Sequence, residues 1–276
     1  TINNAETSEI IALNASSGKS PVKLSPDTFY VVEKGRYYSE FSEGRFDITI
    51  GPVVKMWNIG TDYAAVPDTG KLEEAVRLVD YNKLTLDSKN HTAKLEVDGM
   101  KVDLGAIAKG YAADEAARIL RENGVEHAII NLGGNTIVIG GNLKDEPWKI
   151  GIQDPFNTRG DFLGIVMVKD KTVVTSGIYE RYFERDGKRY HHILDPQNGY
   201  PVDNELYSVS IITDSSINAD ALSTTSLLLG LNEGMKMIEG LDEVEAIFVT
   251  NDKKIYISSG LKDNFILAKS EFQHMP

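Results

Sequence analysis

Strand-like runs separated by turn residues occupy residues 127–213, and they limit the possible fold more than any other feature. In chain order they read HAIINLGGNTIVIGG, WKIGIQD, FLGIVMVKDKTVVTSG, YFERDGKRYHHILD and YSVSIIT. Asp186 and Gly187 predict a hairpin turn within the fourth run. Two short strands at 84–87 and 93–98 and a final hairpin at 244–260 add to this pattern. Because many of these strands are joined by hairpins, we predict an α+β fold with mixed or antiparallel sheets packed with helices, as one domain over residues 1–276.

Helical periodicity is confined to a few segments. It predicts helices at about 26–42, 71–79, 107–124 and 218–230. Ser25 and Pro26 have the residue types of a helix start, and Gly124 is typical of a helix end. We expect Asn218 to cap the last helix and Gly230 to end it.

The chain is acidic, with a formal net charge of -12 and 41 Asp and Glu against 29 Lys and Arg. Direct binding of nucleic acid is therefore disfavoured, because such binding depends on clustered basic residues. A site for an anionic substrate would need a metal ion, a helix N-terminus or a placed lysine. No apolar run approaches the roughly 18 residues of a membrane-spanning helix. The absence of cysteine excludes disulfides and thiolate metal sites.

Asp220 and Thr224 are four residues apart in a predicted helix, so their side chains share one face. Both offer oxygen ligands of the kind that Mg²⁺ accepts. The alternative is that Asp220 stabilises the first turn of the helix while Thr224 packs in the core. Spacing does not separate these interpretations.

The segment VDLGAIAKGYAAD leads from a strand through Gly105 into a helix whose first turn carries Lys109. Backbone amides at such a helix start, together with the lysine, can attract phosphate. The alternative is an ordinary strand-to-helix turn with a solvated lysine. The segment has neither the Lys-Ser/Thr ending of a P-loop nor the three glycines of a dinucleotide fingerprint.

His191 and His192 are adjacent in a predicted strand and must therefore point to opposite faces. This arrangement disfavours joint metal binding and leaves two interpretations: one imidazole acts as a base near neutral pH, or both histidines are structural or surface residues. Two other segments leave binding and structural interpretations open. Phe46 and Trp57 can hold a planar ligand or belong to the core, and the hydroxyl of Ser176 can bind a ligand or the local backbone.

Seven segments together resemble the FAD:protein FMN transferases, the ApbE family, in that family's order. They are SEIIALN, GRFDITIGPVVKMWNIG, VDLGAIAKGYAAD, INLGGNTIVIGG, VVTSGIYERYF, YHHILDPQNGYPV and NADALSTTSLLLG. The resemblance implies an ApbE-like fold with a core related to the T-fold. It also implies a Mg²⁺-dependent enzyme that splits FAD at its pyrophosphate, attaches FMN to a Thr or Ser hydroxyl of an acceptor protein, and releases AMP.

The resemblance also assigns roles to individual residues. Asp220, Thr224 and the carbonyl of Ala106 match the family's metal ligands, and His192 matches the histidine that activates the acceptor hydroxyl. We therefore predict His192 and Asp220 as the catalytic residues. The residues predicted to line the FAD site are Phe46, Asp47, Thr49, Lys109, Ser176 and Ile193. Ile178 and Asn198 depart from the residues common in the family at their positions.

Three further expectations follow from the resemblance. The family usually carries an N-terminal export or lipoprotein segment that this chain, beginning at Thr1, does not contain. The full-length protein is expected outside the cytoplasmic membrane, lipid-anchored, and acting on an acceptor flavoprotein of an electron-transfer system. The alternatives are an FAD pyrophosphatase that yields FMN and AMP, and a protein that binds FAD without turnover.

Overall fold

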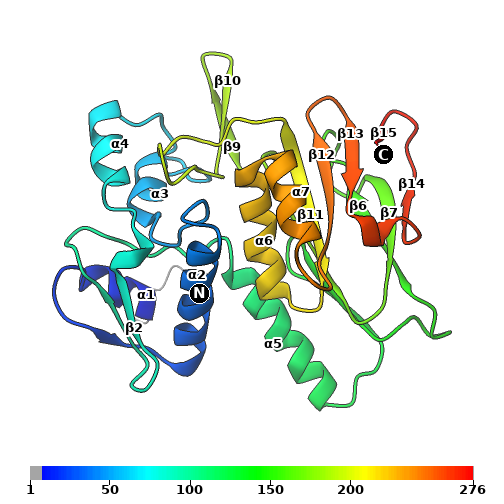
Figure 1. Ribbon diagram of the computed structural model, residues 1–276, viewed down its shortest axis with the longest axis horizontal. Helices are drawn as coiled ribbons and strands as arrows, with labels where there is room; N and C mark the ends of the chain where they lie inside the picture. The colour runs from blue at the N-terminus through cyan, green and yellow to red at the C-terminus, as the bar shows by residue number, and fades with distance from the viewer. Residues whose placement is uncertain (1–7, 276) are drawn as a thin grey trace. The chain divides into compact units, whose positions relative to one another are not determined.

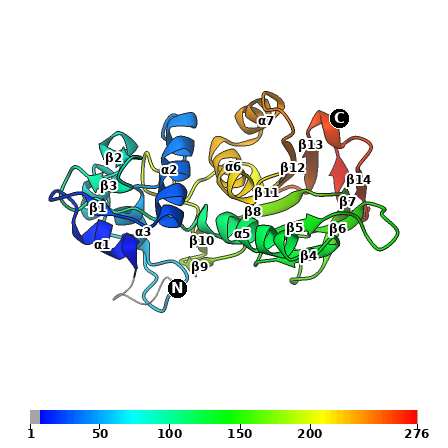
Figure 2. The same cartoon turned by 90° about the horizontal axis from the view of Figure 1, so that it is seen from below.

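The computed structural model describes residues 8–275, which form two compact units (Figure 1, Figure 2). The first unit combines the chain up to residue 105 with residues 181–202, and the second combines residues 106–180 with the chain from 203 onward. Each unit thus contains two separate stretches of sequence. The single domain expected over residues 1–276 stays a prediction.

The first unit contains more helix than strand. Its helices are α1 (Glu9–Ala15), α2 (Pro26–Phe41), α3 (Gly51–Trp57), α4 (Thr69–Val76) and the 3-10 helix η1 (Tyr81–Lys83). Its strands are β1 (Val22–Lys23), β2 (Leu84–Asp87), β3 (Thr92–Leu95), β9 (Tyr182–Arg185) and β10 (Lys188–His191). The first three strands form an antiparallel sheet in the order β1-β3-β2, and the last two form a hairpin.

A buried tryptophan attaches the later stretch of the first unit to its helices. The Trp57 ring packs against Phe183, Tyr190 and Tyr200, and its Nε1 donates a hydrogen bond to the Gly199 carbonyl at 2.7 Å. An indole of this size contributes a large apolar contact area and needs a partner for its N–H when buried. The segment that contains the two adjacent histidines is therefore fixed against α3 and α4.

The second unit is built on a seven-stranded sheet in the order β15-β13-β12-β11-β8-β5-β4. Its strands are β4 (Ala128–Asn131), β5 (Asn135–Ile139), β8 (Thr172–Gly177), β11 (Leu206–Thr213), β12 (Glu245–Thr250), β13 (Lys254–Ile257) and β15 (Gln273–His274). Neighbouring strands within this sheet pair antiparallel, except β13 and β15, which pair parallel. A second sheet, β14-β7-β6, consists of β6 (Trp148–Gln153), β7 (Phe162–Val168) and β14 (Phe265–Leu267).

Three helices and the small sheet complete the second unit: α5 (Ala108–Glu122), α6 (Ser216–Leu229) and α7 (Leu231–Glu239), with the 3-10 helix η2 (Ser259–Leu261). Alternating side chains of β5 reach both neighbouring layers. Ile137 and Ile139 pack with α5, whereas Val138 belongs to the core shared with the small sheet. Helix α6 packs on β8, β11 and α5 (Figure 2). Because both faces of the large sheet are covered, its central strands are almost continuously buried.

The observed elements confirm the predicted mixture of antiparallel and mixed sheets packed with helices. The helices α2, α4 and α5 and the β9–β10 hairpin lie where the pattern predicted them, while α1, α3 and α7 were not predicted. The prediction that Asn218 caps the last helix was wrong. Helix α6 begins at Ser216, because a carboxylate on α5 binds its first amides. Within residues 8–275, no helix has the length and apolar character needed to cross a membrane.

Candidate functional site

Helices α5 and α6 approach each other closely at Gly110. A Cβ atom at this position would lie 2.2 Å from the carbonyl oxygen of Ser216, so only glycine fits without a shift of the backbone. The Gly110 amide donates a hydrogen bond to Oδ2 of Asp220 at 2.9 Å. The amide at the start of α5 therefore binds a carboxylate of the protein, in the manner that the sequence predicted for a phosphate.

Asp114, one turn further along α5, supplies the cap that the start of α6 lacks in its own sequence. Its Oδ1 accepts the Ser216 amide at 2.8 Å, and its Oδ2 accepts the Ile217 amide at 2.9 Å and the Ser215 hydroxyl at 3.2 Å. Burial raises the pKa of Asp114, while these donors act to lower it. Because the first amides of a helix have no partner within the helix, this carboxylate fixes the position of α6 on α5.

Asp220 is a buried carboxylate with a cation beside it. Its exposed fraction is 2%, and the Lys109 ammonium lies 3.7 Å from its Oδ1. Lys109 also donates to Oδ1 of the buried Asn135 at 2.8 Å. Burial raises the pKa of Asp220, and Lys109, the Gly110 amide and Asn135 oppose this effect. A carboxylate that is desolvated in this way favours the approach of a cation.

Thr224 follows Asp220 by one turn and is half-buried. Its Oγ1 lies 3.2 Å from Oγ of Ser176, at the end of β8. The spacing prediction that Asp220 and Thr224 belong to one helix is confirmed, since both lie within α6. Ser176, which was predicted to line the FAD site, contacts Thr224 through its hydroxyl.

The predicted ligands fit Mg²⁺ in chemical type. Asp220, Thr224 and the Ala106 carbonyl offer only oxygen atoms, as this hard cation requires. Ala106 precedes α5, and the Gly110 amide, which could otherwise extend the helix back to the Ala106 carbonyl, donates to Asp220 instead. In residues 8–275, no group of three or more His, Cys, Asp and Glu side chains could hold a metal ion. A metal bound at Asp220 would thus depend on hydroxyl, carbonyl and water oxygens as well.

Asp47 and Thr49, in the first unit, bind to internal partners. The Asp47 carboxylate accepts the Thr49 amide at 2.7 Å, the Thr49 hydroxyl at 2.7 Å and the Tyr81 amide at 3.0 Å. The Thr49 hydroxyl in turn accepts the Asp80 amide at 2.9 Å. Both side chains are buried, as are those of Phe46 and Ile193. The role of these four residues in binding FAD stays a prediction.

The two adjacent histidines differ in environment, as their alternation predicts. His191 is buried, and its Nε2 lies 3.0 Å from the Val202 carbonyl. His192 is half-buried, and its Nδ1 lies 3.1 Å from the Arg181 carbonyl. Since a carbonyl only accepts hydrogen bonds, this contact assigns the proton of neutral His192 to Nδ1 and the basic lone pair to Nε2.

The structure adds Gly110, Asp114 and Asn135 to the predicted residues around Asp220. All three lie in segments that carry the family resemblance, VDLGAIAKGYAAD and INLGGNTIVIGG. The sequence alone did not single them out. Gly110 and Asp114 each contact a residue about a hundred positions away, which local patterns do not reveal. Asp114 could have been found from its position, because it is the acidic residue that ends the segment VDLGAIAKGYAAD.

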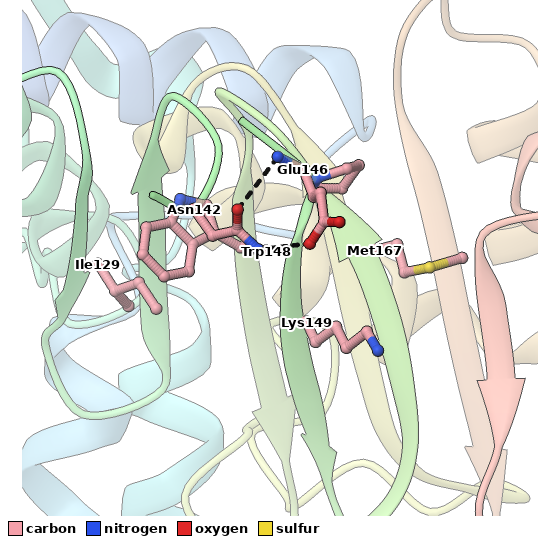
Figure 3. A pocket seen from close by; sticks show the side chains of 7 residues that line it. Ile129, Asn142, Glu146, Trp148, Lys149 and Met167 are labelled. Atoms are coloured by element: carbon pink, nitrogen blue, oxygen red, sulfur yellow. Dashed lines mark hydrogen bonds between the residues drawn. The ribbon is translucent and has the colours of Figure 1, made fainter. Parts of the chain in front are cut away.

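The second unit also has an open hollow of about 700 Å³ around β4, β6 and β7 (Figure 3). It is lined by Ile129, Asn142, Glu146, Pro147, Trp148, Lys149 and Met167. Asn142 and Glu146 bind each other, the Asn142 Nδ2 donating to Oε2 of Glu146 at 3.1 Å. This lining has no member in common with the predicted site residues, so the hollow is separate from the Asp220 cluster.

Comparison with known proteins gives consistent matches along the chain. A family model described as the ApbE family matches residues 2–248. The FAD:protein FMN transferase of Klebsiella pneumoniae (strain 342) is 39% identical over 273 residues, covering 99% of this chain and 84% of that relative. The FAD:protein FMN transferase of Treponema pallidum (strain Nichols) is 38% identical over 282 residues, covering 98% and 78%. The crystal structure of the ApbE protein from Thermotoga maritima matches with a TM-score of 0.86 at 33% identity, covering 93% of this chain and 83% of that chain.

Proposed function

Because the chain belongs to the ApbE family, we propose that it is an FAD:protein FMN transferase. In this reaction FAD is split at its pyrophosphate, FMN becomes attached to a Thr or Ser hydroxyl of an acceptor protein through a phosphoester, and AMP is released. The curated relatives from Klebsiella pneumoniae and Treponema pallidum carry this name.

The observation that carries the proposal is the buried Asp220 carboxylate, with Lys109 beside it and Thr224 on the same helix. In a chain with a net charge of -12, a pyrophosphate needs local positive charge. Lys109 supplies one such charge directly. Asp220, Thr224 and the Ala106 carbonyl would hold Mg²⁺, which when bound would neutralise phosphate charge and favour departure of the AMP phosphate.

The residues of the chain have separate tasks in this scheme. Lys109 attracts the pyrophosphate, and Asp114 holds the start of α6 against α5. His192 accepts the proton of the acceptor hydroxyl at Nε2, because its Nδ1 carries the proton that binds the Arg181 carbonyl. The hydroxyl oxygen then bonds to the phosphorus of FMN as the bond from that phosphorus to the bridging oxygen breaks, and AMP departs with this oxygen.

The setting of the reaction is part of the same proposal. We infer that the full-length protein acts outside the cytoplasmic membrane, anchored by a lipid, on an acceptor flavoprotein of an electron-transfer system. Support comes from the family resemblance alone, because the absence of cysteine fits an exported protein about as well as a cytosolic one. Separation of membrane and soluble fractions from cells that express the full-length protein tests this location.

The activity is tested by incubating the chain with FAD, Mg²⁺ and an acceptor protein that presents a Thr in a short Gly-containing motif. The acceptor should gain the mass of one FMN while an equal amount of AMP is released. His192→Ala should abolish transfer and retain FAD binding, whereas His274→Ala, which changes an exposed imidazole of the second unit, should transfer normally. Release of AMP without a labelled acceptor would favour the pyrophosphatase, and FAD binding without AMP release would favour a binding protein.

A further inference from the structure

Three hydroxyls next to Asp220 form a continuous chain of hydrogen bonds. Oγ of Ser176 lies 2.8 Å from Oγ of Ser223 and 3.2 Å from Oγ1 of Thr224. Oγ of Ser223 donates to the backbone carbonyl of Asp220 at 3.0 Å. The chain therefore begins at one predicted metal ligand, Thr224, and ends at the backbone of the other, Asp220.

The direction of this chain follows from counting protons. Each hydroxyl has one proton to donate, and the Asp220 carbonyl can only accept. Since the proton of Ser223 is directed to that carbonyl, Ser176 must donate to Ser223. The Ser176 proton is then committed, so Thr224 must donate to Ser176. This is the one assignment in which all three hydrogen bonds form.

The assignment determines which part of Thr224 can bind a cation. With its proton directed to Ser176, Oγ1 of Thr224 keeps its lone pairs for other partners, on the helix face that it shares with Asp220. A threonine whose hydroxyl rotates freely would present its proton to a cation for part of the time. Mg²⁺ demands nearly ideal octahedral geometry, so an orientation fixed in advance favours its binding.

We propose that Ser176 and Ser223 are positioning residues that orient the Thr224 hydroxyl for Mg²⁺. The inference rests on the metal binding in the proposed function but is independent of the transfer to an acceptor. A cation on Thr224 would polarise its O–H bond and strengthen each donor further along the chain. Residues that orient a metal ligand in this way typically change metal affinity by 10- to 100-fold when they are replaced.

The test measures how tightly the FAD-free chain binds Mn²⁺, which serves as a probe for the Mg²⁺ site. Electron paramagnetic resonance monitors the binding. Ser176→Ala should raise the Kd for Mn²⁺ by about tenfold or more. The Mg²⁺ concentration for half-maximal AMP release should rise by a similar factor. Ser223→Ala should have a smaller effect of the same kind, because it removes only the constraint on direction. Ser176→Thr keeps the hydroxyl and should restore affinity.

Ser210→Ala provides a matched control. Ser210, on β11, lies opposite Thr175 in the sheet, and their hydroxyls are 2.7 Å apart. Because Thr175 precedes Ser176 in β8, this pair is on the other face of the sheet and does not reach Thr224 through Ser176. Ser210→Ala therefore removes a hydroxyl pair between β8 and β11 and should retain the Kd for Mn²⁺.

Several results would overturn the inference. They are an unchanged Kd in Ser176→Ala, an equal change in Ser210→Ala, or a wild type that binds no Mn²⁺. One result would separate the two proposals: the wild type binds Mn²⁺ but transfers no FMN, and the affinity for Mn²⁺ falls in Ser176→Ala but not in Ser210→Ala. The proposed function would then fail, and the positioning role would stand.

Discussion

The two units each contain an aspartate–threonine pair with opposite surroundings. In the first unit, Asp47 accepts three hydrogen bonds, two from Thr49 and one from the Tyr81 amide. In the second unit, Oδ2 of Asp220 accepts the Gly110 amide, and Oδ1 has the Lys109 ammonium at 3.7 Å. The first carboxylate is surrounded by neutral backbone and hydroxyl donors, whereas the second adjoins the Lys109 ammonium.

This difference indicates that residue type alone does not make a ligand. The spacing of two residues between Asp47 and Thr49 lets the carboxylate bind the amide and hydroxyl of its own partner, as in an Asx turn. Asp220 and Thr224 share one helix face through their spacing of four residues, but Asp220 binds the Gly110 amide and Thr224 contacts Ser176. We therefore expect the first pair to stabilise the fold and the second pair to bind a metal.

The largest expected effect separates the two pairs by activity. Asp220→Asn removes the charge that would hold Mg²⁺, so AMP release from FAD at a fixed Mg²⁺ concentration should fall by about a hundredfold or more, since replacing a ligand should exceed the effect of replacing its supporting residues. Asp47→Asn should leave the Mg²⁺ concentration for half-maximal release within about threefold and lower the free energy of unfolding by about 1–3 kcal/mol. Rates of AMP release over a series of Mg²⁺ concentrations measure both. Equal losses in the two variants would contradict the distinction.

The next effect concerns the backbone that supports Asp220. Gly110→Ala places a Cβ 2.2 Å from the Ser216 carbonyl oxygen, so α5 and α6 must move apart. Overpacking of this kind lowers the free energy of unfolding by about 1–3 kcal/mol, and the separation should also weaken metal binding. Gly70→Ala is the matched control, since Gly70 lies in the first turn of α4 and its Cβ would meet only the Asp68 carboxylate at 3.5 Å. There alanine should be neutral or stabilising in urea denaturation, because it favours the helix.

A smaller effect is expected at the cap of α6. Asp114→Ala leaves the amides of Ser216 and Ile217 without their carboxylate partner and should lower the free energy of unfolding by about 1–2 kcal/mol. Asp68→Ala removes a cap within the first unit, where Asp68 accepts the Lys71 amide of its own helix α4. Both variants should lose stability in urea denaturation, but only Asp114→Ala should also raise the Kd for Mn²⁺. A normal Kd in Asp114→Ala would mean that α6 holds its position without this cap.

The same contrast explains how much the sequence could predict. Local periodicity located α5 and α6, because helix spacing and terminal glycines act over a few residues. The placement of Asp220 and Thr224 on one helix followed from this spacing. By contrast, α3 begins with Gly51 and Pro52, residues more typical of turns, and it is held by the buried Trp57 packed on residues far along the chain. Tertiary contacts there override local preference.

The start of α6 depended on the same kind of distant contact. Asn218 has the residue type of a cap, but Asp114 binds amides two and one residues before it. The contact of Asp47 with Tyr81 could not be predicted either, because this amide lies 34 residues further along the chain, in η1. Sequence thus predicted side chains that lie together within one element. It did not predict the carboxylates that join two elements.

The smallest expected effect is a pH dependence that tests whether burial or hydrogen bonding dominates at Asp47. Burial raises the pKa of Asp47, while the donors from Thr49 and Tyr81 act to lower it. With a folded pKa above the unfolded value of about 3.9, the folded protein retains a proton that the unfolded chain releases. This contribution stabilises the protein fully below about pH 4 and is lost as the pH rises through the folded pKa. Urea denaturation at several pH values from 4 to 7 should therefore give a free energy of unfolding that falls, as the pH rises, relative to that of Asp47→Asn. If the difference grows with pH instead, the three hydrogen bonds outweigh burial, and the Asp47 pair favours the charged carboxylate without any cation.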